Sequence, residues 1–170
     1  MKKAKKFKIE DALNATKAAV EEGIVAGGGA ALTKIAPKLE EFGSKLSEAE
    51  KAGVRVVRNS IDAPLRQIAF NSGIKDPSGI IVAIQEKGSP AHNGYDFTKY
   101  DGGEWSIGLV EDMMKIGIVD PLKVTRMALE NAVSIASTLV TTEAIIVDKP
   151  EPKTPAAPSG MGGGMGGMDY

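Results

Sequence analysis

The amino-acid sequence predicts a mostly α-helical domain with a small β element and a flexible C-terminal end. Three observations lead to this fold class. Apolar residues recur at helical spacings of three and four over most of residues 8–73 and again over residues 120–143. Strand-like patterning is confined to short stretches within residues 88–110 and 144–148. The length of 170 residues, with 42% hydrophobic and 25% charged residues, suits a single globular domain.

The first two helices are predicted on either side of a glycine triplet. Residues 8–22 combine helical apolar spacing with several alanines, and Gly23 ends the run as a C-terminal cap would. After the three glycines of GIVAGGGAAL, residues 30–42 predict a second helix, strained or ended near Pro37.

A third helical region is predicted over residues 46–73. Pro64 should bend or interrupt it, and Gly73 should close it. Residues 76–88 follow an Asp-Pro start and favour a short helix, although GIIVAI alone is equally typical of a strand.

The C-terminal half changes character. Residues 88–110 hold several turn formers, and the aromatic residues around Asp-Gly-Gly indicate a β-hairpin. Residues 110–120 predict a return to helix, and residues 120–143 predict the longest amphipathic helix of the chain. Residues 144–148, AIIVD, predict a short edge-like strand. The proline-rich and then glycine- and methionine-rich residues 149–170 are predicted to be disordered.

Composition excludes several classes of function. The formal net charge of −1 gives no basic stripe for nucleic acid or a membrane surface. The absence of cysteine excludes disulfides and thiolate metal sites, and the single histidine, His92, argues against a histidine-based metal site. The apolar stretches are shorter than the roughly 20 residues of a membrane span. The basic opening MKKAKKFKIE lacks the apolar region of a secretion signal, so we expect the cytoplasm.

Taken singly, the residues that could carry chemistry have structural interpretations. The glycine triplet lacks the lysine and Ser/Thr of a phosphate-binding loop. Two interpretations remain: a tight turn between two helices, which the pattern alone favours, or a segment of backbone exposed to a flat ligand. Asp11 belongs to an acidic pair on a helix, and Asp120 precedes Pro121 as a helix N-cap would. The aromatic residues near Asp-Gly-Gly are typical of cross-strand pairs.

Taken together, five stretches resemble one family, the group I chaperonins of the GroEL type. The stretches are IEDALNATKAAVEEGIVAGGGAAL, APLRQIAFNSG, GIVDPLKVTR, TTEAIIVDKPE and the Gly-Gly-Met tail. The resemblance covers nearly the whole chain and concerns the C-terminal portion of the chaperonin subunit. It implies an intermediate-domain helix over residues 1–22, the C-terminal half of the equatorial ATP-binding domain over residues 23–148, and a tail over residues 149–170.

The resemblance also implies an ATP site and the residues that serve it. Asp11 matches the carboxylate that orients the attacking water for hydrolysis, Gly28 matches a backbone position that lies against the nucleotide, and Asp120 matches the carboxylate that accepts hydrogen bonds from the ribose hydroxyls.

One region departs from the family pattern. The family commonly has Tyr-Asn-Ala-Ala at the adenine, whereas here Tyr95 is followed by Asp96, Phe97 and Thr98, and an insertion surrounds YDGGEWS. Asp96 is a candidate to replace an amide contact, Phe97 is a candidate to stack on the base, and Thr98 lies beside them.

Other parts of the family pattern are missing from the chain. The phosphate-binding Gly-Asp-Gly-Thr-Thr loop, the Mg²⁺ carboxylate and the apical domain for unfolded polypeptide and co-chaperonin do not occur in it, so no metal ligand is assigned here. We therefore expect a truncated or excised piece of an ATP-driven, ring-forming folding machine, with no appreciable ATPase activity by itself. The alternative is a non-catalytic helical module that docks on a complementary fragment or a neighbouring subunit.

Overall fold

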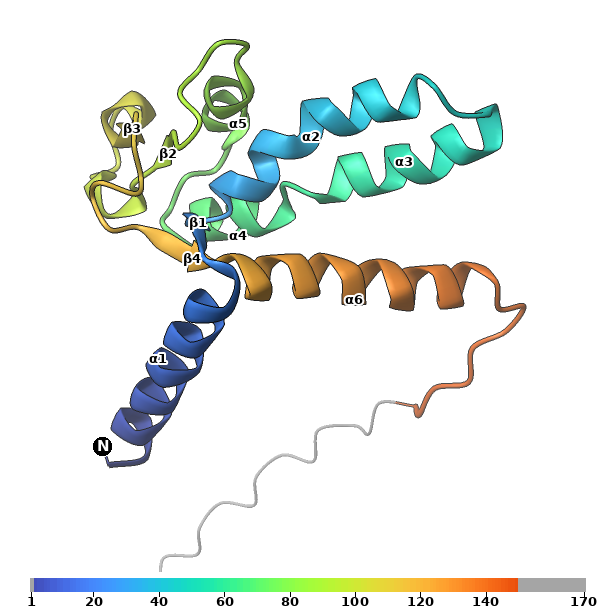
Figure 1. The fold of residues 1–170 in the computed structure, drawn as a ribbon, viewed down its shortest axis with the longest axis horizontal. Helices are drawn as coiled ribbons and strands as arrows, with labels where there is room; N and C mark the ends of the chain where they lie inside the picture. The colour runs from blue at the N-terminus through green and yellow to red at the C-terminus, as the bar shows by residue number, and fades with distance from the viewer. Residues whose placement is uncertain (1, 150–170) are drawn as a thin grey trace, which may run out of the picture.

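The computed structural model describes residues 2–149 and confirms a mostly helical fold, with two small two-stranded sheets (Figure 1). Its elements, in chain order, are α1 (Lys2–Glu22), β1 (Ile24–Ala26), α2 (Ala30–Gly43), α3 (Glu48–Ser60), α4 (Ala63–Asn71), α5 (Ser78–Gln85), β2 (Gly94–Tyr95), the 3-10 helices η1 (Phe97–Lys99) and η2 (Trp105–Gly108), β3 (Leu109–Val110), β4 (Val119–Pro121) and α6 (Leu122–Val140).

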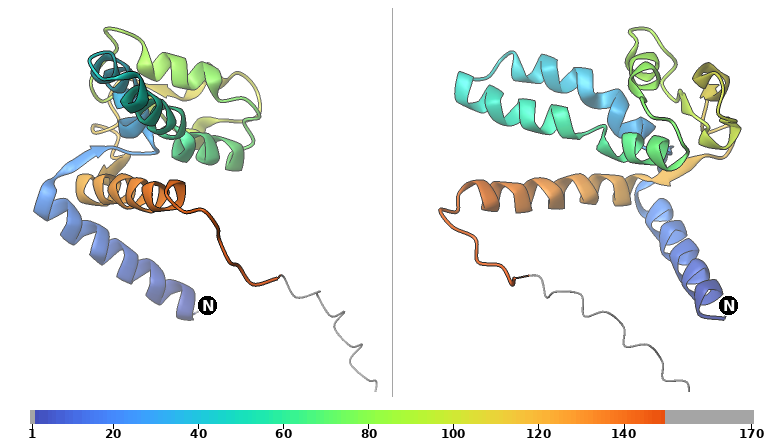
Figure 2. Two further views of the ribbon diagram at one scale, coloured as in Figure 1. Left: turned by 90° about the vertical axis from the view of Figure 1, so that its right-hand side faces the viewer. Right: turned by 180° about the vertical axis from the view of Figure 1, so that it is seen from behind.

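Helix α1 projects away from the rest of the chain in all three ribbon views (Figures 1 and 2). It starts six residues earlier than the predicted start at residue 8 and is longer than α6, with 21 residues against 19. Gly23 ends it as predicted: its φ is +86°, and its N–H donates to the Ala19 carbonyl at 2.8 Å. The left-handed φ at this position favours glycine, which has no Cβ.

Helices α2 and α3 form an antiparallel hairpin that extends to one side (Figure 1). Pro37 does not end α2, which runs through it to Gly43. Helix α3 starts at a capping box in which the Ser47 N–H donates to the Glu50 carboxylate at 3.0 Å. Two hydrogen bonds from Ser47, one from the hydroxyl and one from the backbone, lower the pKa of Glu50.

The predicted interruption at Pro64 is confirmed, because α3 ends at Ser60 and α4 begins at Ala63 with Pro64 in its first turn. Residues 78–85 form the helix α5, which resolves the choice between helix and strand. A helix places the three isoleucines of this segment on one face, toward the core. The buried apolar cluster consists of Ala26, Ala30, Leu65, Ala69, Ile74, Ile80, Ile81, Ile84, Tyr95 and Met113.

Strands β1 and β4 pair in an antiparallel manner, with Val25 opposite Asp120, and were not predicted from the sequence. Strands β2 and β3 also pair in an antiparallel manner. The predicted hairpin around Asp-Gly-Gly is wrong in detail, because residues 96–108 form a connection with two 3-10 turns rather than a tight turn. Tyr95 lies inside the core, and Trp105 packs on Gly79, so neither aromatic residue takes part in a cross-strand pair with the other.

The predicted helix at residues 110–120 is also wrong. Residues 111–118 form turns, because the Asp112 carboxylate accepts the N–H groups of Met114 at 3.0 Å and Lys115 at 3.2 Å, and Gly117 has a φ of +78°. A side chain that bonds its own following backbone in this way competes with helix formation.

Helix α6 lies below the α2–α3 hairpin in Figure 1 and contributes no fully buried residue. The strand predicted for residues 144–148 is absent from the described structure, where these residues are extended without a ladder and Ile146 is 98% exposed. A strand needs a partner for its backbone groups, and residues 2–149 supply none there. The predicted disordered tail falls, except for its first residue, outside the described residues.

Candidate functional site

The glycine triplet forms the turn between β1 and α2, and each glycine there has a different physical reason. The Gly27 N–H donates to the Ile118 carbonyl at 3.0 Å and so prolongs the β1–β4 pairing. A Cβ at Gly27 would lie 3.0 Å from the Val119 nitrogen, and a Cβ at Gly29 would lie 2.7 Å from the Leu65 nitrogen. Both positions are therefore closed to larger residues by the protein's own backbone.

Gly28 differs from its two neighbours because the protein leaves room beside it. Its φ is +64°, but the atoms nearest to a Cβ added at this position would lie at ordinary contact distance: Phe97 Cε2 at 3.8 Å, the Tyr95 carbonyl oxygen at 3.9 Å and the Met113 methyl at 4.0 Å. The space beside Gly28 thus admits a Cβ, and it is bounded by a ring, a carbonyl and a thioether methyl. A ligand that approached Gly28 would meet main chain rather than a side chain at this position.

Asp120 lies on β4 beside the same turn and is half-buried. Burial raises the pKa of its carboxyl group, and the backbone N–H groups of Gly28 and Gly29 act in the opposite direction. The predicted N-cap role is wrong: Pro121 occupies the N-cap position of α6, with no side-chain cap hydrogen bond. The carboxylate instead faces the N-terminal end of α2, where unpaired N–H groups and the helix dipole favour negative charge.

Residues 95–98 lie beside Gly28 through the Tyr95 carbonyl oxygen and the Phe97 ring. The rings of Tyr95 and Phe97 contact each other with centroids 4.7 Å apart and planes at 55°, and Phe97 remains partly exposed. Asp96 is buried, and its Oδ1 accepts the Thr98 N–H at 3.0 Å and the Thr98 hydroxyl at 2.6 Å. Lys99 Nζ lies 3.9 Å from Asp96 Oδ2. Both oxygens of the carboxylate are therefore engaged in shaping the turn.

Asp11 lies apart from this group. It is exposed in the middle of α1, eleven positions before Glu22, which corresponds to about 16 Å along the helix axis. Helix α1 meets the rest of the chain at its C-terminal end, where Arg126 contacts Glu22 at 2.6 Å and Glu130 at 2.8 Å, and Lys123 pairs with Glu21. The structure thus brings Gly28, Phe97 and Asp120 together and leaves Asp11 outside.

The residues beside Gly28 offer a carboxylate that can accept hydrogen bonds from hydroxyl groups, a partly exposed aromatic ring, and bare main chain at Gly28 itself. This set suits a ligand with a sugar-like diol and a flat ring. Among residues 2–149, no three His, Cys, Asp or Glu side chains are grouped so that they could hold a metal ion. The same part of the chain has no helix with the length and apolar character to cross a membrane.

Comparison with known proteins identifies the family. The model of the TCP-1/cpn60 chaperonin family matches residues 1–150. The chain belongs to this family. Members of this chaperonin family bind and hydrolyse ATP.

Two solved chaperonin structures resemble the fold. One is the open-state monomer of a group II chaperonin from Methanococcoides burtonii, with a TM-score of 0.64 and 24% identity over 78% of this chain and 32% of that chain. The other is a group III chaperonin in the open state, with a TM-score of 0.61 and 29% identity over 76% of this chain and 25% of that chain. This chaperonin chain therefore spans a quarter to a third of the structures that it matches.

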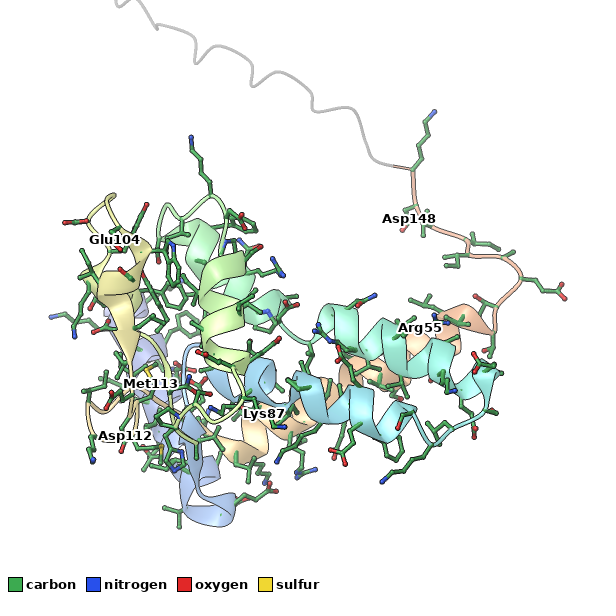
Figure 3. All side chains as sticks on the ribbon, turned by 90° about the horizontal axis from the view of Figure 1, so that it is seen from above. Arg55, Lys87, Glu104, Asp112, Met113 and Asp148 are labelled. Atoms are coloured by element: carbon green, nitrogen blue, oxygen red, sulfur yellow. The ribbon has the colours of Figure 1, made fainter. Side chains whose placement is uncertain are left out.

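Sequence reasoning missed two residues beside Gly28. Met113, which is labelled in Figure 3, belongs to the buried core, and its methyl also lies 4.0 Å from the Cβ position of Gly28. Gly29 supplies an N–H to the Asp120 carboxylate in addition to its packing role. The signal for Gly29 was present as a second consecutive glycine before a helix, whereas nothing local to Met113 distinguishes it from other core methionines.

Proposed function

We propose that this chain supplies the adenosine side of the ATP site in a ring-forming, group I chaperonin subunit. The observation that carries the proposal is that Asp120 and Phe97 each lie beside Gly28, in a chain of the chaperonin family. In this proposal the Asp120 carboxylate accepts hydrogen bonds from the ribose hydroxyls, Gly28 lies against the nucleotide, and the Phe97 ring contacts the base. The group I assignment rests on the sequence motifs.

Asp96 and Thr98 have a supporting role in the proposed site. Because the Asp96 carboxylate accepts two hydrogen bonds from Thr98 and lies near Lys99, it shapes the turn that presents Phe97. This arrangement favours Phe97 over Asp96 as the residue that meets the base. Mg²⁺ would come with ATP and take its protein ligands from a part of the subunit outside this chain.

Asp11 is proposed as the hydrolytic carboxylate, and this role requires α1 to move. The helix joins the rest of the chain through Gly23, whose left-handed φ separates α1 from β1. Rotation there would bring the Asp11 side of α1 toward the nucleotide, so that the carboxylate orients water for in-line attack. Residues 1–22 would then belong to an intermediate domain and residues 23–148 to an equatorial domain, in a cytoplasmic ring that acts on unfolded polypeptide with a co-chaperonin.

The test is reconstitution. The chain is co-expressed with the preceding portion of a group I subunit, and nucleotide binding and Mg²⁺-dependent ATP hydrolysis are measured on the assembled particle. We expect Asp11→Ala to abolish hydrolysis and preserve binding, and Gly28→Val to abolish both. Glu10→Gln is the matched control, because Glu10 neighbours Asp11 and, among the described residues, forms an exposed ion pair with Lys6 at 3.4 Å. Hydrolysis that survives Asp11→Ala, or binding that survives Gly28→Val, would contradict the proposal.

A second candidate function is a non-catalytic assembly module. It is favoured by the exposed apolar residues after α6, where Ile145, Ile146 and Val147 are 64%, 98% and 77% exposed. An extended apolar segment of this kind is suited to pairing with the strand edge of another chain. Native mass spectrometry distinguishes the two functions: a ring that retains nucleotide favours the first, and a nucleotide-free heteromer favours the second.

A further inference from the structure

Lys34 on α2 inserts its ammonium group into a cluster of oxygen atoms on the loop between α5 and β2. Its Nζ contacts the Ser89 hydroxyl at 2.7 Å, the Asn93 side-chain oxygen at 2.5 Å, the Ser89 carbonyl at 3.3 Å and the Pro90 carbonyl. An ammonium group has only three hydrogens to donate, so four acceptors exceed its capacity for directed hydrogen bonds. The arrangement resembles an oxygen shell around a cation.

The surroundings of this shell also favour a positive charge. Helix α5 ends at Gln85, and the C-terminal end of a helix carries a partial negative charge. The Asn93 amide nitrogen lies 3.3 Å from the Ala83 carbonyl, and the Ser89 hydroxyl lies 3.2 Å from the Ile84 carbonyl. Asn93 is buried, which keeps its oxygen oriented toward Lys34. The polar side chains of the shell are thus held in place by the last carbonyls of α5.

The chemistry of the oxygens points to a monovalent ion. The four oxygens that contact Lys34 Nζ are two carbonyls, a hydroxyl and an amide oxygen, and all are neutral. Sites for Ca²⁺ and Mg²⁺ rely on carboxylates to offset two positive charges. Neutral carbonyl oxygens that replace a hydration shell are typical of K⁺ sites.

We propose that these four oxygens form a monovalent-cation site whose resident cation is the tethered ammonium of Lys34, and that free K⁺ binds there when the ammonium is removed. Because the ammonium group is part of the chain, Lys34 occupies the site at all times and holds the loop of residues 86–93 against α2. Burial lowers the pKa of Lys34, as expected for an ammonium partly withdrawn from water.

The site has a structural consequence for the residues that follow the loop. The loop leads directly into β2, where a Cβ at Gly94 would lie 2.7 Å from Met113 Cγ and 3.0 Å from the Ala30 methyl. The Met113 N–H donates to the His92 carbonyl at 2.9 Å. Ordering of the loop by a cation therefore also orders β2 and the residues that follow it.

The test compares Lys34→Ala with Lys38→Ala in the full chain. Lys38 lies on the same helix and is exposed, so Lys38→Ala removes one positive charge, as Lys34→Ala does, but leaves the oxygen shell occupied by Lys34. Hydrogen exchange of residues 86–95 is measured in choline chloride, NaCl and KCl at one ionic strength, with residues 65–71 as the internal reference. We expect Lys34→Ala to lose about tenfold protection of residues 86–95 in choline chloride, which corresponds to the loss of a charged hydrogen bond. KCl should restore the protection in a saturable manner.

Three outcomes with the single variants would overturn the proposal. The first is equal protection of Lys34→Ala in choline chloride and KCl, and the second is an equal response of Lys38→Ala to KCl. The third is failure of Lys34→Ala to order residues 86–95 in every salt, because K⁺ should replace the missing charge. A second variant, Lys34→Ala with Asn93→Ala, removes one oxygen of the shell and should shift the KCl response to higher concentration. An unchanged KCl response in that variant would place the ion elsewhere and refute the assignment.

Discussion

The substitution Gly29→Ala tests the close packing of the glycine turn. Alanine would have to adopt a φ of +78°, and its Cβ would lie 2.7 Å from the Leu65 nitrogen and 3.0 Å from the Leu65 Cα. The left-handed conformation costs about 1–2 kcal/mol for a residue with a Cβ. The overlap with the α4 backbone adds about 1–3 kcal/mol, because neither contact atom is the end of a flexible side chain.

Gly28→Ala and Gly53→Ala separate these two contributions. Gly28 has a similar φ of +64° but no contact shorter than 3.8 Å, so only the conformational cost of about 1–2 kcal/mol applies. Gly53 lies within α3 with nothing near its Cβ position, so alanine there should stabilise the fold by about 0.5–1 kcal/mol. The expected order of stability is therefore Gly53→Ala, wild type, Gly28→Ala and, last, Gly29→Ala.

The assay is urea unfolding of the full chain followed by far-ultraviolet circular dichroism, with the free energy of unfolding compared among the four proteins. A free energy for Gly29→Ala equal to that for Gly28→Ala would refute the packing argument. It would mean that α4 moves away from the turn at no cost.

Three further predictions concern pH, fluorescence and the orientation of α1. Burial raises the pKa of Asp120 above its ordinary value of 3.8, so its contribution to the free energy of unfolding is present at pH values below 3.8 and is lost as the pH rises through the folded-state pKa. The free energy of unfolding of Asp120→Asn, measured against pH, should lack this loss, and a pH profile identical to that of the wild type would contradict the prediction. Gly79→Val should displace Trp105, because the Trp105 ring lies 2.8 Å from the Cβ position of Gly79. The fluorescence emission of this single tryptophan should then shift to longer wavelength, and unchanged emission would exclude the contact. Arg126→Met removes the ion pairs with Glu22 and Glu130. The distribution of distances between spin labels on α1 and α6 should therefore broaden. A distribution as narrow as that of the wild type would show that the β1–β4 strands alone orient α1.

The helices were largely predictable because their signals are local. Apolar spacing, Gly23 and Pro64 all act within a few residues, and the structure has helix ends at or next to these positions. Pro37 was misleading, because α2 accommodates the proline in its interior. Local signals thus indicate a helix more reliably than they indicate its end.

The errors concentrate where distant residues decide the structure. The β1–β4 pair joins three-residue segments separated by more than 90 positions, and neither segment is long enough to show a strand pattern. At residues 111–118, the Asp112 side chain ends a run that its apolar spacing had indicated as helical. Residues 144–148 have the composition of a strand, but a strand also requires a partner.

The candidate site was predicted only in part from residue patterns. The glycine triplet stands out in the sequence, yet its pattern alone favours a simple turn over a ligand-binding backbone. Only the resemblance to chaperonins indicates a nucleotide at Gly28. The structure adds that Asp120 faces the glycine turn and that Phe97 borders Gly28. The role of Asp11 stays a prediction, because its position on α1 depends on a movement rather than on a contact.

The attachment of α1 by one end has a mechanical consequence. The helix has 21 residues and so is about 31 Å long. A rotation of about 10° at Gly23 would carry Asp11 through about 3 Å and the far end through about 5 Å. A small change of the backbone at Gly23 therefore moves the distant end of α1 by several times as much. The ion pair between Arg126 and Glu22 lies next to Gly23, so a small displacement of this pair changes the position of the whole helix.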